Sequence, residues 1–161
     1  MVPNKEVETL WNYISRSIAR IILCLDGLNE DDLNWKPLDN ANSLYVLAIH
    51  MMGNVESNIL GVLCHQNILR QRENEFSAHG TTAESVQQKW REIQERITSH
   101  LAQLPPYILD QEQEHPRRGR ITGRDLMIGV ARHAAEHVGH AELTRDLLFT
   151  ARGRALPPRE F

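Results

Sequence analysis

Apolar residues recur every three or four positions along four long stretches of this chain, which is the spacing of amphipathic α-helices. The first stretch begins near Val7 and ends near Gly27, a residue type that often follows the last turn of a helix. The second begins at Ser43, a suitable N-cap, and continues to Leu63. Because no stretch shows the alternation of a strand, the pattern predicts an all-α protein.

The third and fourth stretches carry their own start and stop signals. Residues 81–84, Thr-Thr-Ala-Glu, offer a capping box, and two prolines at 105–106 end the third helix. Thr122, with Asp125 three residues later, begins a fourth helix that runs to about Arg152. Two connections, over about 66–80 and 106–121, are longer than the roughly 2–8 residues that join helices in simple bundles. The first of them has room for a short helical piece. We therefore predict a four-helix bundle with at least one crossover connection.

Length and composition favour one domain. The 161 residues, of which 41% are apolar, predict a single domain over 1–161, with a core from about 4 to 151 and a loose tail over 152–161. No run approaches the roughly 20 apolar residues of a membrane span. The net charge of −3 argues against nucleic-acid binding. Cys24 and Cys64 form no CxxC motif, which predicts buried free thiols. Without a secretory signal at the N-terminus, the expected compartment is the cytoplasm.

Three histidines lie within "VARHAAEHVGH", residues 130–140. His133 and His137 are four apart, so they lie on one face of a helix. The helix face that holds His133 and His137 continues through mostly apolar positions to Leu148. We therefore expect this face, and both imidazoles, to point into the bundle. A buried imidazole without partners costs about 1–3 kcal/mol. A divalent metal removes this cost, and a hydrogen-bonded histidine pair without metal is the alternative.

A third histidine, His50, lies in the middle of the second helix among apolar residues. Two inward histidines on one helix and a third at mid-height of another match the three-nitrogen arrangement of an open catalytic metal site. The four remaining histidines lie in polar or helix-end surroundings, and we expect them at the surface: His65, His79, His100 and His115.

Two further residues near this stripe are candidates for catalysis. His140 lies three positions after His137, where it is a candidate for a spare ligand, a hydrogen-bond donor behind the ligands, or a base. Glu136 is a candidate for proton transfer, and a solvated helix position is its alternative interpretation.

The sequence resembles the DinB/YfiT-like family of metal-dependent enzymes in two stretches. "LNWKPLDNANSLYVLAIHMMGNVE" is similar to the family's Trp-x-Pro loop, capping serine and second-helix histidine. "ARHAAEHVGHAELTRDLL" is similar to its last-helix pair of histidines. The resemblance implies a bundle with a crossover, a homodimer, and a nickel or zinc site with His50, His133 and His137 as ligands. It also implies thiol S-transfer with a low-molecular-weight thiol cosubstrate.

The leading hypothesis is a metal-dependent enzyme that acts on a small molecule, either a thiol S-transferase or a hydrolase. Three imidazoles leave a coordination position for a thiol or a water. Nickel, zinc and iron all accept imidazole ligands. The alternative is a non-catalytic metal-binding or stress-response module, which a fourth protein ligand such as His140 would favour.

Two other metal enzymes fit less well. "HAAEH" matches the H-x-x-E-H pattern of inverted zinc peptidases, with Glu136 as base, but the 24 residues after His137 hold no further core helix for an acidic ligand. Di-iron chemistry requires two ExxH pairs, and the one ExxH here, at 112–115, lies in a connection beside Pro116.

Overall fold

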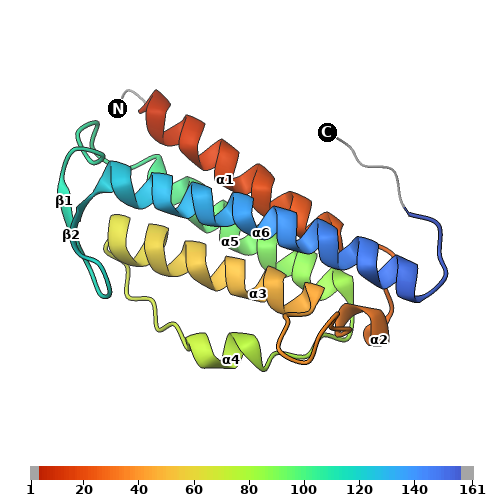
Figure 1. The fold of residues 1–161 in the computed structure, drawn as a ribbon. Coiled ribbons are helices and arrows are strands. Elements are labelled where there is room, and N and C mark those ends of the chain that lie inside the picture. The colour runs from red at the N-terminus through yellow and green to blue at the C-terminus, as the bar shows by residue number, and fades with distance from the viewer. Residues whose placement is uncertain (1–3, 157–161) are drawn as a thin grey trace.

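Four long helical segments lie side by side and carry most of the chain (Figure 1). The computed structural model describes residues 4–156. Its elements are, in chain order, α1 (Lys5–Leu23), α2 (Glu30–Leu33), α3 (Leu44–Val55), the π-helix η1 (Glu56–Leu63), α4 (Arg72–Phe76), α5 (Ala83–Leu101), β1 (Glu112–His115), β2 (Gly119–Thr122) and α6 (Gly123–Ala151). The chain is thus mostly helical, as the periodicity predicts.

Ser43 and Thr122 cap helices as the sequence predicts, whereas α5 is capped by Thr82, one residue after the Thr81 that a capping box over 81–84 requires. The side-chain oxygens of Ser43, Thr82 and Thr122 each accept a backbone N–H three residues later, at 3.2, 3.3 and 3.0 Å. Each bond satisfies an amide that the first turn leaves without a partner. After α1, Gly27 turns the chain with a φ of +72°, a conformation that glycine adopts without strain.

The longest apolar run, Leu44–Leu63, forms α3 and η1. By length and composition it would suffice to cross a membrane, so the expectation that no run reaches this length was wrong. However, 72% of its most apolar window is buried inside the structure. The run is therefore a core helix of the protein. At its end the backbone bonds shift to i→i−5 spacing, as in the bond from Cys64 N to Ile59 O.

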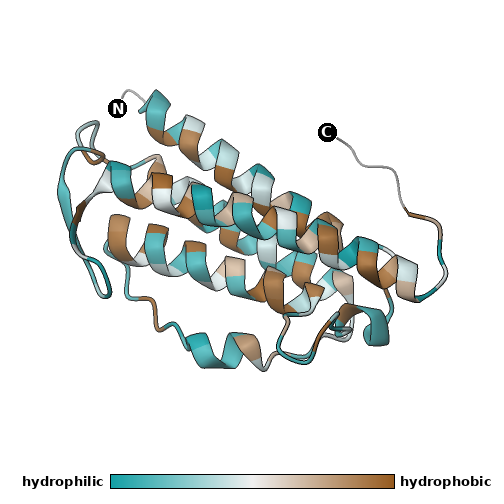
Figure 2. Cartoon of the chain, viewed as in Figure 1, coloured by the Kyte–Doolittle hydropathy of each residue, from teal (hydrophilic) through white to brown (hydrophobic). Residues whose placement is uncertain are grey.

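The core lies between these long helices. α6 packs mainly against α1 and also contacts α3 and η1, whereas α5 contacts α1, α3 and η1. Apolar positions, brown in Figure 2, gather on the long helices, while α4 and the β1–β2 hairpin are largely teal. The core includes the fully buried side chains of Ile14, Ile18, Leu25, Met51, Leu60 and Ile97.

The connection over 106–121 contains strands that the sequence pattern did not predict. β1 and β2 pair antiparallel, with Glu112 opposite Thr122 and His115 opposite Gly119. The inward positions of β1 hold the polar residues Gln113 and His115 instead of apolar ones, so no apolar alternation marks the strand. The hairpin lies beside the first turns of α6 (Figure 1).

The first residues of the predicted loose tail are held in place by Asp32. The Asp32 carboxylate is only 2% exposed and pairs with Arg152 at 2.9 Å and with Arg154 at 2.6 Å. Residues 157–161 of that tail lie outside the described residues. The extent of one domain over 1–161 stays a prediction.

Both cysteines are free and buried, as the sequence predicts. Burial raises the pKa of the Cys24 thiol to about 11 and that of Cys64 to about 12. Neither thiol therefore forms an appreciable amount of thiolate near neutral pH.

Candidate metal centre

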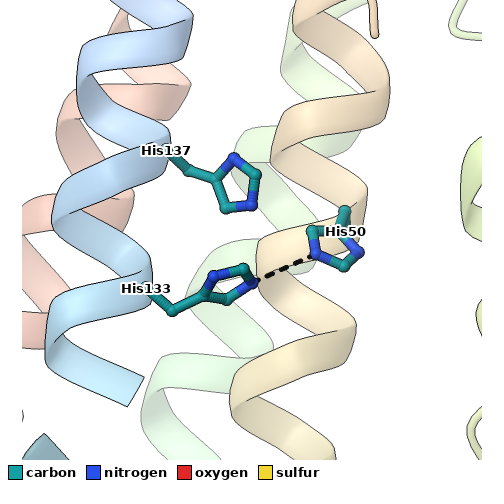
Figure 3. A group of neighbouring side chains, drawn as sticks. All are labelled: His50, His133 and His137. Atoms are coloured by element: carbon teal, nitrogen blue, oxygen red, sulfur yellow. Dashed lines mark hydrogen bonds between the residues drawn. The ribbon is translucent and has the colours of Figure 1, made fainter. Parts of the chain in front are cut away.

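Two histidines of α6 face one histidine of α3 across the helix interface (Figure 3). The ring centroids of His133 and His137 lie 4.5 Å apart, and that of His50 lies 5.5 and 5.2 Å from them. One possible ligand nitrogen from each ring lies within 4.8 Å of the other two. The structure thus brings together the three residues proposed as ligands, while their role as metal ligands stays a prediction.

The environment keeps these imidazoles uncharged. His50 is buried, and His133 and His137 are half-buried. Burial lowers the pKa of all three rings below the usual 6.5. For His137 the pKa falls to about 3, because burial acts together with the nearby His133, His50 and His140. Neutral imidazole is the form that binds a cation.

His50 is oriented by a buried carboxylate. Nδ1 of His50 donates to Oε2 of Glu75 at 2.9 Å, and Arg70 donates to both oxygens of Glu75 at 2.6 and 2.7 Å. Burial alone would raise the pKa of Glu75, but the hydrogen bonds from Arg70 and His50 outweigh it and lower the pKa. An ionised Glu75 accepts the Nδ1 proton, so the lone pair of His50 lies on Nε2.

The spacing of the ring nitrogens suits a shared cation. Nε2 of His50 lies 3.3 Å from Nε2 of His133 (Figure 3). Two nitrogens bound to one tetrahedral zinc at its usual bond length lie about 3.3 Å apart. Without a cation, this distance is favourable only if one nitrogen carries a proton and donates a hydrogen bond to the other. The donor set and its spacing therefore fit a divalent metal.

Glu136 and His140, the two further candidates, lie behind the ring cluster. Oε2 of Glu136 is 3.7 Å from Nδ1 of His133, too long for a hydrogen bond, and Glu136 also forms an ion pair with Arg132. Nδ1 of His140 lies 3.3 Å from Nδ1 of His137. His140 is exposed and is not in the group of three that shares the 4.8 Å limit.

Sequence reasoning missed Glu75 and Arg70. Both come from the polar connection around α4, which Figure 1 shows running alongside α3. Phe76 of the same helix packs on His50, with ring centroids 5.0 Å apart. The connection between the end of η1 and Glu75 carries no periodic signal that would indicate this contact. The sequence allowed a short helical piece in this connection, but it gave no indication that this piece contacts His50.

Four other histidines were predicted to lie at the surface. The prediction is confirmed for His65 and His79, which are exposed, while His100 is partly exposed. It was wrong for His115, which is buried and lies with Nε2 3.0 Å from Oδ1 of Asn58. The hairpin turns this ring inward against η1, which the polar sequence around it did not reveal.

Comparison with known proteins supports the family and the fold. The sequence model of the mycothiol-S-transferase family matches residues 9–149. The crystal structure of a DinB-like protein from Bacillus cereus ATCC 10987 is similar, with a TM-score of 0.70 at 15% identity over 97% of each chain. None of the curated proteins matches the sequence at a significant level. Because the family match spans most of the helices, the chain belongs to the mycothiol S-transferase family of DinB-like proteins.

Proposed function

We propose that this chain is a metal-dependent transferase that joins the sulfur of a low-molecular-weight thiol to a small electrophile. The observation that carries the proposal is the convergence of His50, His133 and His137, with one nitrogen of each ring within 4.8 Å of the others. The family match adds the thiol as the expected cosubstrate. Nickel and zinc are the favoured metals, and iron also suits three imidazoles.

The bound metal would keep a coordination position for the thiol and lower the pKa of its S–H group, so that the nucleophilic thiolate forms at neutral pH. The protein holds the ligands ready for this. Burial keeps the rings unprotonated, and Glu75 fixes the Nδ1–H tautomer of His50. His133 keeps 31% of its side chain exposed, which leaves a path for a small molecule from solution.

Glu136 and His140 remain our candidates for the base that takes the thiol proton. Both carry a basic atom near the Nδ1 side of a ring in the cluster, and both are exposed to water. In the reaction the sulfur forms a bond to the electrophilic carbon while the leaving group departs with the bonding electron pair. A base at the edge of the site removes the S–H proton.

Two alternatives use the same residues. A hydrolase would use a water in place of the thiol. A non-catalytic metal-binding module would need a fourth protein ligand, and the contact of His140 with the Nδ1 side of His137 favours an open position instead.

The proposal also includes a cytoplasmic homodimer and a four-helix bundle with a crossover. The crossover is supported by packing: α6 follows α5 in the chain but lies mainly against α1 and α3. The connection between α5 and α6 would then cross the end of the bundle.

Elemental analysis of the purified protein tests the metal site. We expect about one nickel or zinc ion per chain and loss of that metal in His133→Ala. His100→Ala is the matched control, because His100 is on α5 and its ring lies 2.8 Å from the carbonyl oxygen of Arg96. Unchanged metal content in His133→Ala would overturn the ligand assignment, and full turnover of thiol and electrophile after chelation would overturn the enzyme mechanism.

A further inference from the structure

A pocket of about 600 Å³ adjoins the candidate metal centre between α3, η1, α6 and the hairpin. Its lining includes His133 itself and Gly129, one helical turn earlier on α6. From the facing helix it includes Asn54, one turn after His50. Side chains one turn apart on a helix are about 5–6 Å from each other. A molecule in this pocket would therefore reach the histidine cluster with one of its ends.

The pocket carries two positive charges that no carboxylate neutralises. Arg117 and Arg118 line it, and neither forms an ion pair with any residue in the described range 4–156. A third arginine of the lining, Arg132, is paired with Glu136. The one acidic lining residue, Asp125, accepts a hydrogen bond from Thr122 at 2.8 Å at the start of α6. The pocket is therefore suited to an anion.

The hairpin turn that carries these arginines is held rigidly by His115. Nδ1 of His115 accepts the backbone N–H groups of Arg117 and Arg118, both at 3.1 Å. Nε2 then carries the proton and donates to Oδ1 of Asn58 at 3.0 Å, which ties the turn to η1.

The guanidinium of Arg118 rests on the helix that carries His133. A Cβ atom on Gly129 would lie 2.8 Å from Nη1 of Arg118. The Arg118 side chain therefore occupies the space that a side chain at position 129 would fill. Because Gly129 is one turn before His133, this positive charge lies close to the cluster.

Asn54 provides a second recognition group. Asn54 lines the pocket and is only 8% exposed, and its Oδ1 accepts no hydrogen bond from any residue that the structure describes. A buried acceptor without a donor costs about 1–3 kcal/mol. A ligand with an N–H or O–H group beside its anionic group would remove that cost.

We propose that this pocket binds the anionic end of the thiol cosubstrate, so that the preferred thiol carries a carboxylate. The carboxylate pairs with Arg117 and Arg118, an amide or hydroxyl donates to Asn54, and the sulfur points toward the three histidines. Guanidinium groups bind carboxylates through paired hydrogen bonds, which are among the strongest that proteins form. This inference rests on the proposed function for the identity of the ligand as a thiol.

Calorimetric titration with two matched probes tests the pocket without using the metal. S-methylglutathione has two carboxylates and a blocked sulfur, and its diethyl ester lacks the negative charges. We expect the unmodified protein to bind the acid at least about tenfold more tightly than the ester, a difference of about 1.4 kcal/mol. The double variant Arg117→Gln/Arg118→Gln should bind the two probes about equally. Arg120→Gln is the matched control, because Arg120 is on the same hairpin but pairs with Glu112 and Glu114.

Equal binding of acid and ester by the unmodified protein would overturn the inference, as would full discrimination in the double variant. If circular dichroism shows that the double variant is unfolded, the salt dependence of probe binding to the unmodified protein tests the inference instead. Affinity for the acid should fall as salt rises, while affinity for the ester should not, and a salt-independent preference would overturn the assignment.

Metal analysis of the same samples separates the two proposals. A protein that binds no metal but prefers the acid would refute the transferase mechanism and leave the anion pocket standing. A protein that binds metal through the histidines but does not distinguish the probes would refute the pocket alone.

Discussion

Glu75 accepts a hydrogen bond from Nδ1 of His50 at 2.9 Å, and both side chains are buried. The contact joins the core helix α3 to the short helix α4, and Arg70 completes it from the same connection. Its consequence is chemical as well as structural, because it places the lone pair of His50 on the nitrogen that faces His133.

Replacing Glu75 should therefore weaken metal binding without removing a ligand. In Glu75→Gln the acceptor of the His50 proton loses its charge, and we expect the affinity for zinc or nickel to fall by about 10–100-fold. Competition with a chelator measures this. Glu73→Gln is the matched control, because Glu73 is an exposed residue of the same helix. Equal affinities in the two variants would show that Glu75 does not orient His50 for a metal.

His140→Ala should leave the metal stoichiometry unchanged. His140 contacts the Nδ1 side of His137 and lies outside the group of three ring nitrogens. We expect an affinity loss of no more than about 10–100-fold, whereas His137→Ala should lose the metal altogether. Elemental analysis and chelator competition compare the two variants. Equal losses would identify His140 as a fourth ligand and favour the non-catalytic module.

His115 should make the stability of the protein depend on pH. Burial, with Arg118 and Arg117 nearby, lowers the pKa of His115 in the folded state below the usual 6.5. Above pH 6.5 the ring is neutral in both states, and its contribution to stability is fully present. As the pH falls toward the folded-state pKa, the unfolded chain takes up a proton that the folded chain does not, so that contribution is lost.

The variant His115→Gln isolates this effect. At pH 7.5 we expect it to be less stable than the unmodified protein by about 1–3 kcal/mol, because the bonds to Asn58 and the turn are lost. Below pH 6.5 the difference should shrink by up to about 1.4 kcal/mol per pH unit. Urea unfolding at several pH values measures it. A difference that stays constant with pH would contradict a neutral, buried His115.

The ion pairs of Asp32 should stabilise the end of α6. In Arg152→Gln/Arg154→Gln the buried carboxylate loses both cationic partners, and we expect unfolding to become easier by about 1–3 kcal/mol. Adding Asp32→Asn should restore part of this loss, because the unpaired charge is removed. Arg96→Gln, which breaks an exposed pair with Glu56, should cost less than about 1 kcal/mol. Thermal unfolding compares them, and equal effects would contradict a structural role for Asp32.

The sequence was informative where a residue acts within one helix. The caps at Ser43 and Thr122 could be located, and that of α5 to within one residue, because capping depends on residues three positions away. The pairing of His133 with His137 follows from helical spacing in the same way. The position of His50 opposite them could be proposed because it lies at mid-height of an apolar helix.

Contacts between segments without periodicity could not be predicted. Glu75 reaches His50 only because the connection after η1 folds back along α3, and nothing in its polar sequence specifies that path. His115 is buried by a hairpin whose strands are four residues each, too short and too polar to show alternation. Both contacts depend on tertiary packing, and both involve residues that the local pattern assigns to a solvated connection.

The two buried thiols bear on how a protein with the proposed activity would withstand its own electrophilic substrate. A protein that handles electrophiles risks alkylation of its own cysteines, since thiolates are the groups these reagents attack first. With both of its cysteines, Cys24 and Cys64, enclosed in the core and held protonated, the folded chain offers such a reagent no cysteine thiolate. The small thiol at the proposed site should then consume the electrophile, and repeated exposure should leave the mass of the native protein unchanged.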